Sequence, residues 1–102
     1  MKKGMYNNRW YHICKAIVII NRGGGNIGNT ALARDVGISR QAMNRVMIDA
    51  VKYGWVTVSE IEWRPNVMAK RYHPSKKGMQ AVGRCEGFIN RWESLKRLER
   101  KL

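Results

Sequence analysis

The chain has 102 residues, of which 20 are lysine or arginine and 7 are aspartate or glutamate, so its formal net charge is +13. This length allows a single small domain over residues 1–102 with a thin core, and the 44% of hydrophobic residues exclude a disordered tail. The longest apolar run, residues 16–20, is far shorter than the roughly 20 residues that cross a bilayer. We expect no secretion signal, and the two cysteines, Cys14 and Cys85, fit a reducing compartment.

The excess of positive charge indicates an anionic partner. The self-repulsion of so many cations is offset when a protein binds nucleic acid, the commonest such partner, or an anionic membrane surface. A basic surface that only keeps the protein soluble is the alternative. We disfavour it because the basic residues coincide with a recognisable motif.

Hydrophobic periodicity and turn residues predict the order helix, helix, helix, strand, strand, helix. The first helix is expected over residues 6–22, and the glycine-rich segment 23–28 is expected to be a loop without a strand. Asn29 or Thr30 is expected to cap a short second helix. Gly37 is expected to end this helix, because glycine adopts a left-handed turn at little cost.

The second half of the chain is predicted to be a hairpin followed by a long helix. Ser39 is expected to cap the third helix, which ends at Gly54. Residues 55–74 are rich in β-branched and aromatic residues and contain an internal turn signal, which predicts a β-hairpin. A final helix is expected over residues 75–102, with Ser75 as its cap. Because a two-stranded hairpin is not stable alone, it must pack on the helices.

Residues 29–54 meet the structural demands of a helix-turn-helix. A small residue, Ala33, falls where the two helices touch, and Gly37 supplies the positive φ of the tight turn. Apolar residues stand at the positions that fill the angle between the helices, namely Leu32, Val36, Ile38, Met43 and Val46. A plain helical hairpin in a core uses similar apolar spacing, so the exposed face decides between the two interpretations.

The exposed face of the third helix carries side chains that suit base edges and phosphates. These are Ser39, Arg40, Gln41, Asn44 and Arg45, with Thr30 at the start of the second helix. Arginine pairs with guanine, and glutamine or asparagine pairs with adenine, in a major groove about 12 Å wide that admits a helix. The sequence therefore predicts a DNA-binding helix over residues 39–53.

The predicted hairpin has basic residues where it can reach DNA. Arg64 and Asn66 stand at its tip, and Lys70 and Arg71 lie on the returning strand. A narrow minor groove has an enhanced negative potential that attracts an inserted arginine. A solvated turn residue is an equally good interpretation of Arg64.

Residues 29–82 resemble the winged-helix transcription regulators of the MarR and PadR types. The segments that carry the resemblance are Leu32-Ala33, Gly37-Ile38-Ser39-Arg40, Gly54-Trp55-Val56 and residues 70–78. The resemblance implies a mainly α fold with a small β-hairpin wing at residues 55–74. It also implies a DNA-binding regulator, usually dimeric, whose third helix enters the major groove and whose wing lies near the minor groove.

In the resembled families the first and last helices build the dimer. The resemblance therefore implies a homodimer interface that contains Trp10, Phe88, Ile89, Trp92 and Leu95. Packing of the last helix on the first helix of the same chain is the alternative.

Gly78, Gly83 and Gly87 each weaken the last helix by about 1 kcal/mol relative to alanine. They either permit close helix approach or mark a kink.

Two apolar residues of the third helix, Ile48 and Val51, stand where the resembled families have polar residues. With Asn44 and Trp55 they form a stripe at three- and four-residue spacing. Packing beneath the first or last helix is the interpretation that we favour. A patch for a protein partner is the alternative.

The sequence indicates no catalytic, metal or cofactor site. Cys14, Cys85, His12 and His73 lack the paired spacing of metal ligands, and we expect buried inert thiols rather than a redox switch. The glycines of residues 23–28 match a dinucleotide-binding pattern, but no series of strand–helix units follows them.

We expect a cytoplasmic, nucleoid-associated regulator that binds double-stranded DNA, without a cofactor and without enzymatic activity. An RNA-binding or ribonucleoprotein module and a protein-interaction adaptor are the alternatives.

Overall fold

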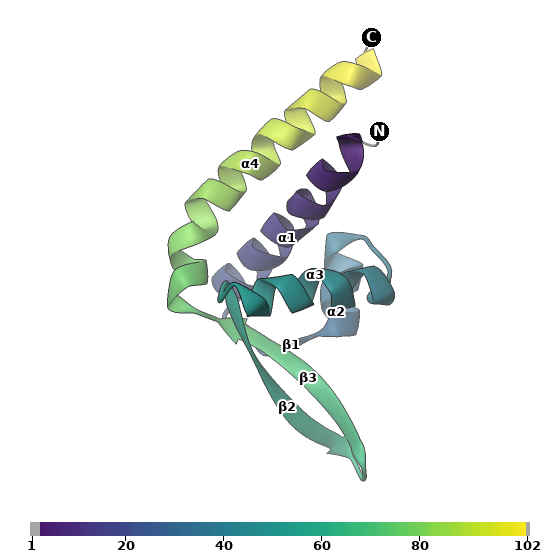
Figure 1. The fold of residues 1–102 in the computed structure, drawn as a ribbon, viewed down its shortest axis with the longest axis vertical. Coiled ribbons are helices and arrows are strands. Elements are labelled where there is room, and N and C mark those ends of the chain that lie inside the picture. Colours follow the sequence, from purple (N-terminus) through teal and green to yellow (C-terminus); the bar gives the residue numbers. More distant parts are fainter. Residues whose placement is uncertain (1–2, 102) are drawn as a thin grey trace.

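The computed structural model describes residues 3–101, so residue 102 of the expected final helix lies outside the described part. The elements in chain order (Figure 1) are α1 (Lys3–Gly23), β1 (Ile27–Gly28), α2 (Asn29–Val36), α3 (Arg40–Lys52), β2 (Val56–Arg64), β3 (Val67–Pro74) and α4 (Lys76–Lys101). None of these helices combines the length and the apolar composition that a membrane span requires. The fold is mainly α with a small wing, which confirms the predicted class.

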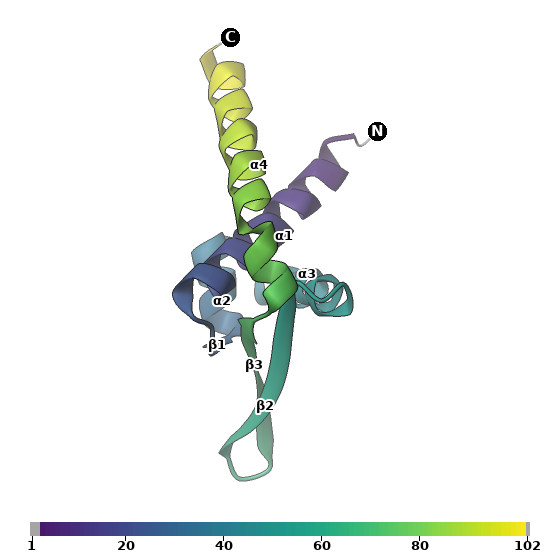
Figure 2. The ribbon, with the colours of Figure 1, turned by 90° about the vertical axis from the view of Figure 1, so that its left-hand side faces the viewer.

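The molecule is elongated, with principal extents of 53 × 27 × 21 Å. Helices α1 and α4 pack on each other and extend to one side of the core, while strands β2 and β3 project to the opposite side (Figure 1). Figure 2 shows that α1 and α4 diverge toward the two chain ends. Helices α2 and α3 lie beside α1, between the helical arm and the wing.

The hydrophobic core lies where all four helices meet the base of the wing. Helix α1 contributes Ile13, Cys14, Ile17 and Ile20, whose spacing puts them on one helix face. They pack with residues of the other elements, namely Leu32, Val36, Met43, Val46, Met47, Val56, Tyr72, Ala81 and Cys85. Burying each large aliphatic side chain stabilises the fold by roughly 1.5–3 kcal/mol. This cluster fixes the angle between α2 and α3.

The turn between α2 and α3 forms as predicted. Ala33 is buried at the contact of the two helices, and Gly37 ends α2 with a φ of 92° in the left-handed region. The N–H groups of Gly37 and Ile38 donate to the carbonyl oxygen of Ala33 at 2.8 and 3.0 Å. The side-chain oxygen of Ser39 accepts a hydrogen bond from the N–H of Ala42 at 3.0 Å, so Ser39 caps α3.

Replacing Ser39 with alanine is expected to lower the free energy of unfolding by about 1 kcal/mol, because the first turn of α3 loses its side-chain acceptor. Chemical denaturation with urea measures this change. Ser39→Asp retains an acceptor and is expected to keep most of the stability. Ser94→Ala, at an exposed position of α4, is the control and is expected to change stability by less than about 0.5 kcal/mol. Equal losses for Ser39→Ala and Ser94→Ala would contradict the capping role.

The expected cap of α2 was wrong. The cap position is Gly28, in extended conformation, and no side chain caps the helix. Asn29 is the first helical residue, and its Nδ2 donates to the carbonyl oxygen of Arg40 at 3.2 Å. Thr30 is exposed in the first turn. The last residue of strand β1, Gly28, is directly followed by α2, and glycine has no side chain that could cap the helix.

The segment expected to contain no strand holds the short strand β1. Ile27 pairs with Tyr72 and Gly28 with Arg71, which adds β1 antiparallel to β3. The sheet therefore has three strands in the order β1-β3-β2. A strand of this length has no periodicity of its own, and it exists only through pairing with a segment that is distant in sequence. It anchors the start of α2 against the wing.

The wing is a long antiparallel hairpin that is buried only at its base. Its register runs from Val56 opposite Pro74 to Arg64 opposite Val67, with an irregularity near Glu62. Asn66 adopts a positive φ of 63° in the turn, and its N–H donates to Oε2 of Glu62 at 2.9 Å. The predicted turn at the tip is confirmed, and the tip lies far from the core (Figure 1).

Helix α4 is continuous over Lys76–Lys101. The side-chain oxygen of Ser75 accepts from the N–H of Gly78 at 2.9 Å, so Ser75 caps α4 as predicted. A Cβ at Gly78 would lie 1.9 Å from the carbonyl oxygen of Trp55, whereas a Cβ at Gly83 or Gly87 would meet nothing within 4 Å. Close approach of the helix is therefore real at Gly78 and absent at the other two positions.

Candidate nucleic-acid interface

Helix α3 divides cleanly into a buried face and an exposed face. Met43, Val46, Met47 and Ala50 are buried in the core. The helical period then turns the intervening polar residues outward, and all four are exposed: Arg40, Gln41, Asn44 and Arg45. The structure thus presents the predicted base-reading side chains together on one surface, with the Ser39 cap at its start.

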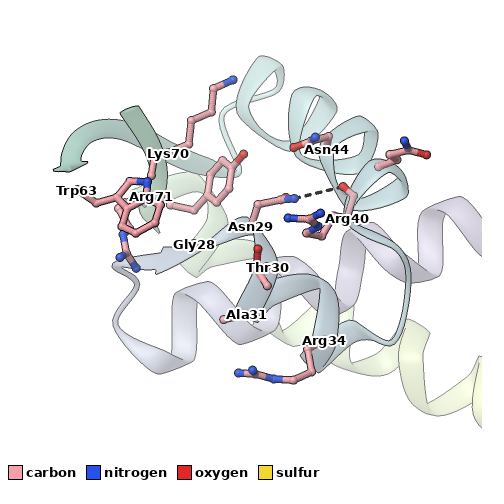
Figure 3. Close-up of a pocket in the computed structure, with 13 residues that line it drawn as sticks. Gly28, Asn29, Thr30, Ala31, Arg34, Arg40, Asn44, Trp63, Lys70 and Arg71 are labelled. Atoms are coloured by element: carbon pink, nitrogen blue, oxygen red, sulfur yellow. Dashed lines mark hydrogen bonds between the residues drawn. The ribbon is translucent and has the colours of Figure 1, made fainter. Parts of the chain in front are cut away.

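A groove of about 780 Å³ separates the start of α2 and α3 from the wing. Figure 3 shows Arg40 and Asn44 on the α3 side, Lys70 and Arg71 on the wing side, and Asn29 and Thr30 between them. The groove brings together residues that the sequence predicted separately, namely Thr30, Arg40, Gln41, Asn44, Lys70 and Arg71. Helix α3 and the wing therefore share one continuous surface.

The groove is strongly cationic. Among the described residues, those that line it include four cations and no carboxylate; the cations are Arg34, Arg40, Lys70 and Arg71. Arg34 lies 3.8 Å from Asp35, but this pair is exposed and therefore weak. Such a surface attracts polyanions such as the phosphate backbone of nucleic acid.

The residues of the groove that were not predicted as site residues include Asn29, Arg34 and Trp63. Arg34 belongs to the cation excess, but only the pairing of β1 with β3 reveals that α2 lies beside the wing. Buried atoms without a hydrogen-bond partner in residues 3–101 include Oδ1 of Asn29 and Nε of Arg71. Such atoms are uncommon in folded proteins and often occur at functional sites.

The tip of the wing lies outside the groove. The Arg64 guanidinium stacks over the Trp63 ring at 4.1 Å from the ring centre. Arg64 and Asn66 are exposed, and neither lines the groove. Arg45 is also outside it, farther along the exposed face of α3. The predicted site residues therefore form three neighbouring parts: the groove, the outer face of α3 and the wing tip.

The residues expected in a dimer interface are mostly engaged within the chain. Trp10 meets Trp55 and Phe88 edge to face, with ring centres 5.3 and 6.4 Å apart. Trp92 stacks on Phe88 at 6.3 Å and on a tyrosine of α1. Ile89 packs against the core, whereas Leu95 is 59% exposed. The aromatic residues thus pack between the first and last helices of one chain, as the alternative interpretation expects.

Polar contacts reinforce the packing of α1 on α4. Tyr11 donates its hydroxyl proton to Oε2 of Glu93 at 2.7 Å, and burial together with this carboxylate raises the pKa of Tyr11 to about 12. Arg22 makes two hydrogen bonds to Glu86, at 2.5 and 2.7 Å. These contacts hold α1 and α4 together as one helical arm.

The cysteines are free and buried, in agreement with the sequence interpretation. Cys14 lies on α1 and Cys85 on α4, and the interaction with Cys85, together with burial, raises the pKa of Cys14 well above its usual range. A protonated thiol is a poor nucleophile. Among residues 3–101, no three histidine, cysteine or acidic side chains gather as metal ligands.

The favoured interpretation of Ile48 was wrong. Val51 and Trp55 pack against the core, but Ile48 is 62% exposed. The helical period turns Ile48 to the same side as the polar residues of α3, away from both α1 and α4. The stripe expected from sequence is therefore split between the core and the outer surface.

These elements define a winged helix-turn-helix domain. Two solved structures share its fold: the MarR family protein Rv2887 of Mycobacterium tuberculosis, in complex with p-aminosalicylic acid, and the zinc-dependent MarR family transcriptional regulator AdcR in its Zn(II)-bound state. The first is 18% identical, with a TM-score of 0.59 over 91% of this chain and 65% of that chain. The second is 16% identical, with a TM-score of 0.53 over 93% of this chain and 61% of that chain.

The chain thus spans less than two thirds of the length of either MarR family protein. No protein-family model matches the sequence, and no curated protein matches it. The likeness confirms the MarR-like winged-helix fold that the sequence predicted.

Proposed function

We propose that the chain is a transcription regulator that binds double-stranded DNA with α3 in the major groove and the wing beside the adjacent minor groove. The observation that carries this proposal is the continuous carboxylate-free surface of the described residues that joins the exposed polar face of α3 to the wing. A helix of this type fits a major groove about 12 Å wide. The net charge of +13 supplies the attraction to phosphates.

The surface suggests a division of roles. The groove between α3 and the wing receives the sugar-phosphate backbone, where Arg34, Lys70 and Arg71 bind phosphates. Gln41, Asn44 and Arg45, with Arg40 beside them, contact base edges from the outer face of α3. At the wing tip, Arg64 enters the minor groove and Asn66 supports it.

We propose further that two copies bind a roughly palindromic site. The exposed Leu95 and Leu98, 59% and 57% accessible, extend the apolar side of α4 beyond the intrachain aromatic cluster. Together with Trp10, which is 38% exposed, they offer the second copy an apolar surface. Half-sites about 34–36 Å apart then place both α3 helices in successive major grooves. The mass of the protein from light scattering tests the dimer.

Replacing Gln41 with alanine is expected to weaken binding to the preferred duplex by about 1–3 kcal/mol, because a base edge loses its hydrogen-bonding partner. A selection from random duplex DNA first identifies that site, and fluorescence anisotropy then compares it with an unrelated duplex. Gln80→Ala, which removes an exposed glutamine from α4, is the matched control and should change neither affinity.

Two results would count against this assignment. Equal losses on both duplexes would assign Gln41 to backbone contact or to folding rather than to base recognition. Tighter binding to structured RNA than to any selected duplex, measured in direct competition, would overturn the proposal of a DNA regulator in favour of an RNA-binding module.

A further inference from the structure

One exposed apolar side chain interrupts the polar face of α3. Gln41, Asn44, Arg45 and Ile48 stand at positions i, i+3, i+4 and i+7, so they share one side of the helix. Ile48 is 62% exposed, in contrast to Val51, which packs against the core. Ile48 is therefore placed where a side chain of α3 meets the edges of base pairs.

An exposed isoleucine needs no explanation by itself, since isolated apolar residues are common on protein surfaces. A protein-docking patch requires apolar neighbours, and the two that were expected, Val51 and Trp55, are turned toward the core. The exposed residues that flank Ile48 on α3 are Asn44, Arg45 and Lys52 instead. An apolar group among hydrogen-bonding and cationic groups matches the surface of a DNA major groove.

We propose that Ile48 contacts the C5-methyl group of a thymine and thereby makes thymine a required base of the binding site. This inference rests on the proposed binding of duplex DNA by α3. In the major groove, thymine is the one base that presents a methyl group, and apolar side chains distinguish it by contact with that methyl. Contact with a methyl group requires no hydrogen bond, so the aliphatic side chain of Ile48 suits it.

The geometry also predicts where this thymine lies. A helix rises about 1.5 Å per residue, so Ile48 stands about 10 Å along α3 from Gln41. Successive base pairs are about 3.4 Å apart along the duplex. The thymine contacted by Ile48 is therefore displaced by at most about three base pairs from the base contacted by Gln41.

The test compares thymine with uracil, which lacks only the C5-methyl group. Selection from random duplex DNA identifies the preferred site, and each thymine of that site is then replaced singly by deoxyuridine. For the wild-type chain we expect one position, within about three base pairs of the Gln41-dependent base, at which this change weakens binding about three- to fivefold. The same change at the other thymines is expected to have little effect.

The variant Ile48→Ala decides whether Ile48 causes the discrimination. Because the side chain is mostly exposed, the variant is expected to fold as the wild type does, which its circular dichroism and urea unfolding check. It should bind the thymine and uracil duplexes equally. Met79→Ala, which truncates an equally exposed residue on α4, is the control and should retain the wild-type ratio.

The outcomes separate this inference from the proposed function. If the wild-type chain binds duplex DNA but shows no thymine-to-uracil difference at any position, the inference is wrong and the DNA-binding proposal stands. The inference is also wrong if Ile48→Ala keeps the full difference. Absence of any duplex binding by the wild-type chain overturns both.

Discussion

Raising the salt concentration from 50 to 200 mM is expected to weaken binding to duplex DNA by about 10³–10⁵-fold, provided that the chain engages about 6–10 phosphates. Cations bound along DNA are released when protein cations neutralise phosphates, so binding weakens as salt rises. In the proposed complex of two copies, the three cations assigned to phosphates in each chain, Arg34, Lys70 and Arg71, engage about six phosphates. Fluorescence anisotropy on one labelled duplex over this salt range measures the slope.

A single substitution tests whether the salt effect comes from the groove. Arg34→Ala is expected to reduce the slope of log affinity against log salt by about 0.9 for each bound copy, because each copy loses one phosphate contact. Arg97→Ala, an exposed arginine of α4, is the matched control and should leave the slope unchanged. A flat salt response of the wild-type chain would contradict the electrostatic contact proposed for the groove and the wing.

The helix-turn-helix was predictable because its determinants are local. Gly37 and Ser39 act on backbone groups within four residues, through the turn to Ala33 and the cap of Ala42. The period of apolar residues in α3 likewise determines which side faces the core. The polar surface of Arg40, Gln41 and Asn44 followed from that period alone.

Features that depend on distant segments were not predictable in the same way. Strand β1 forms because Ile27 meets Tyr72, and no local pattern of two residues encodes such a pairing. The same pairing makes Gly28, rather than Asn29 or Thr30, the cap position of α2. It also places Arg34 beside the wing, and no local pattern indicates that Arg34 lines the groove.

The exposure of Ile48 could have been predicted. Its spacing of seven residues from Gln41 corresponds to nearly two helical turns, which puts both on one side of α3. The apolar character of Ile48 favours burial, whereas its position on the helix favours exposure. The same criterion correctly separates it from Val46 and Met47, which are buried. Position on the helix is therefore the better guide to which apolar residues of α3 are exposed.

Three segments of the chain meet at the start of α4 around a buried asparagine. The Nδ2 of Asn21 donates to the carbonyl oxygens of Ile17 and Trp55 at 2.8 and 3.3 Å, and its Oδ1 accepts from the N–H of Ser75 at 3.2 Å. Ser75 donates its hydroxyl proton to the carbonyl oxygen of Gly54 at 2.7 Å. This network joins α1 and α4 to the base of the wing and leaves no space for another side chain.

Gly78→Ala is therefore expected to lower the free energy of unfolding by about 3 kcal/mol or more, since overpacking and broken hydrogen bonds add. The new Cβ would lie 1.9 Å from the carbonyl oxygen of Trp55 and 2.6 Å from Nδ2 of Asn21. The backbone of Trp55 cannot rotate away as a side chain can, so α4 must shift from the wing. Urea denaturation at one fixed protein concentration measures the loss.

Gly83→Ala provides the control within the same helix. A Cβ at Gly83 meets nothing within 4 Å, so the higher helix propensity of alanine is expected to stabilise the protein by up to about 1 kcal/mol. The two substitutions are chemically identical, and they are expected to have opposite signs because only Gly78 touches the backbone of Trp55. A Gly78→Ala variant as stable as Gly83→Ala would show that α4 does not approach the wing this closely. The orientation of the wing relative to α3, on which the proposed DNA contacts depend, would then have to be different.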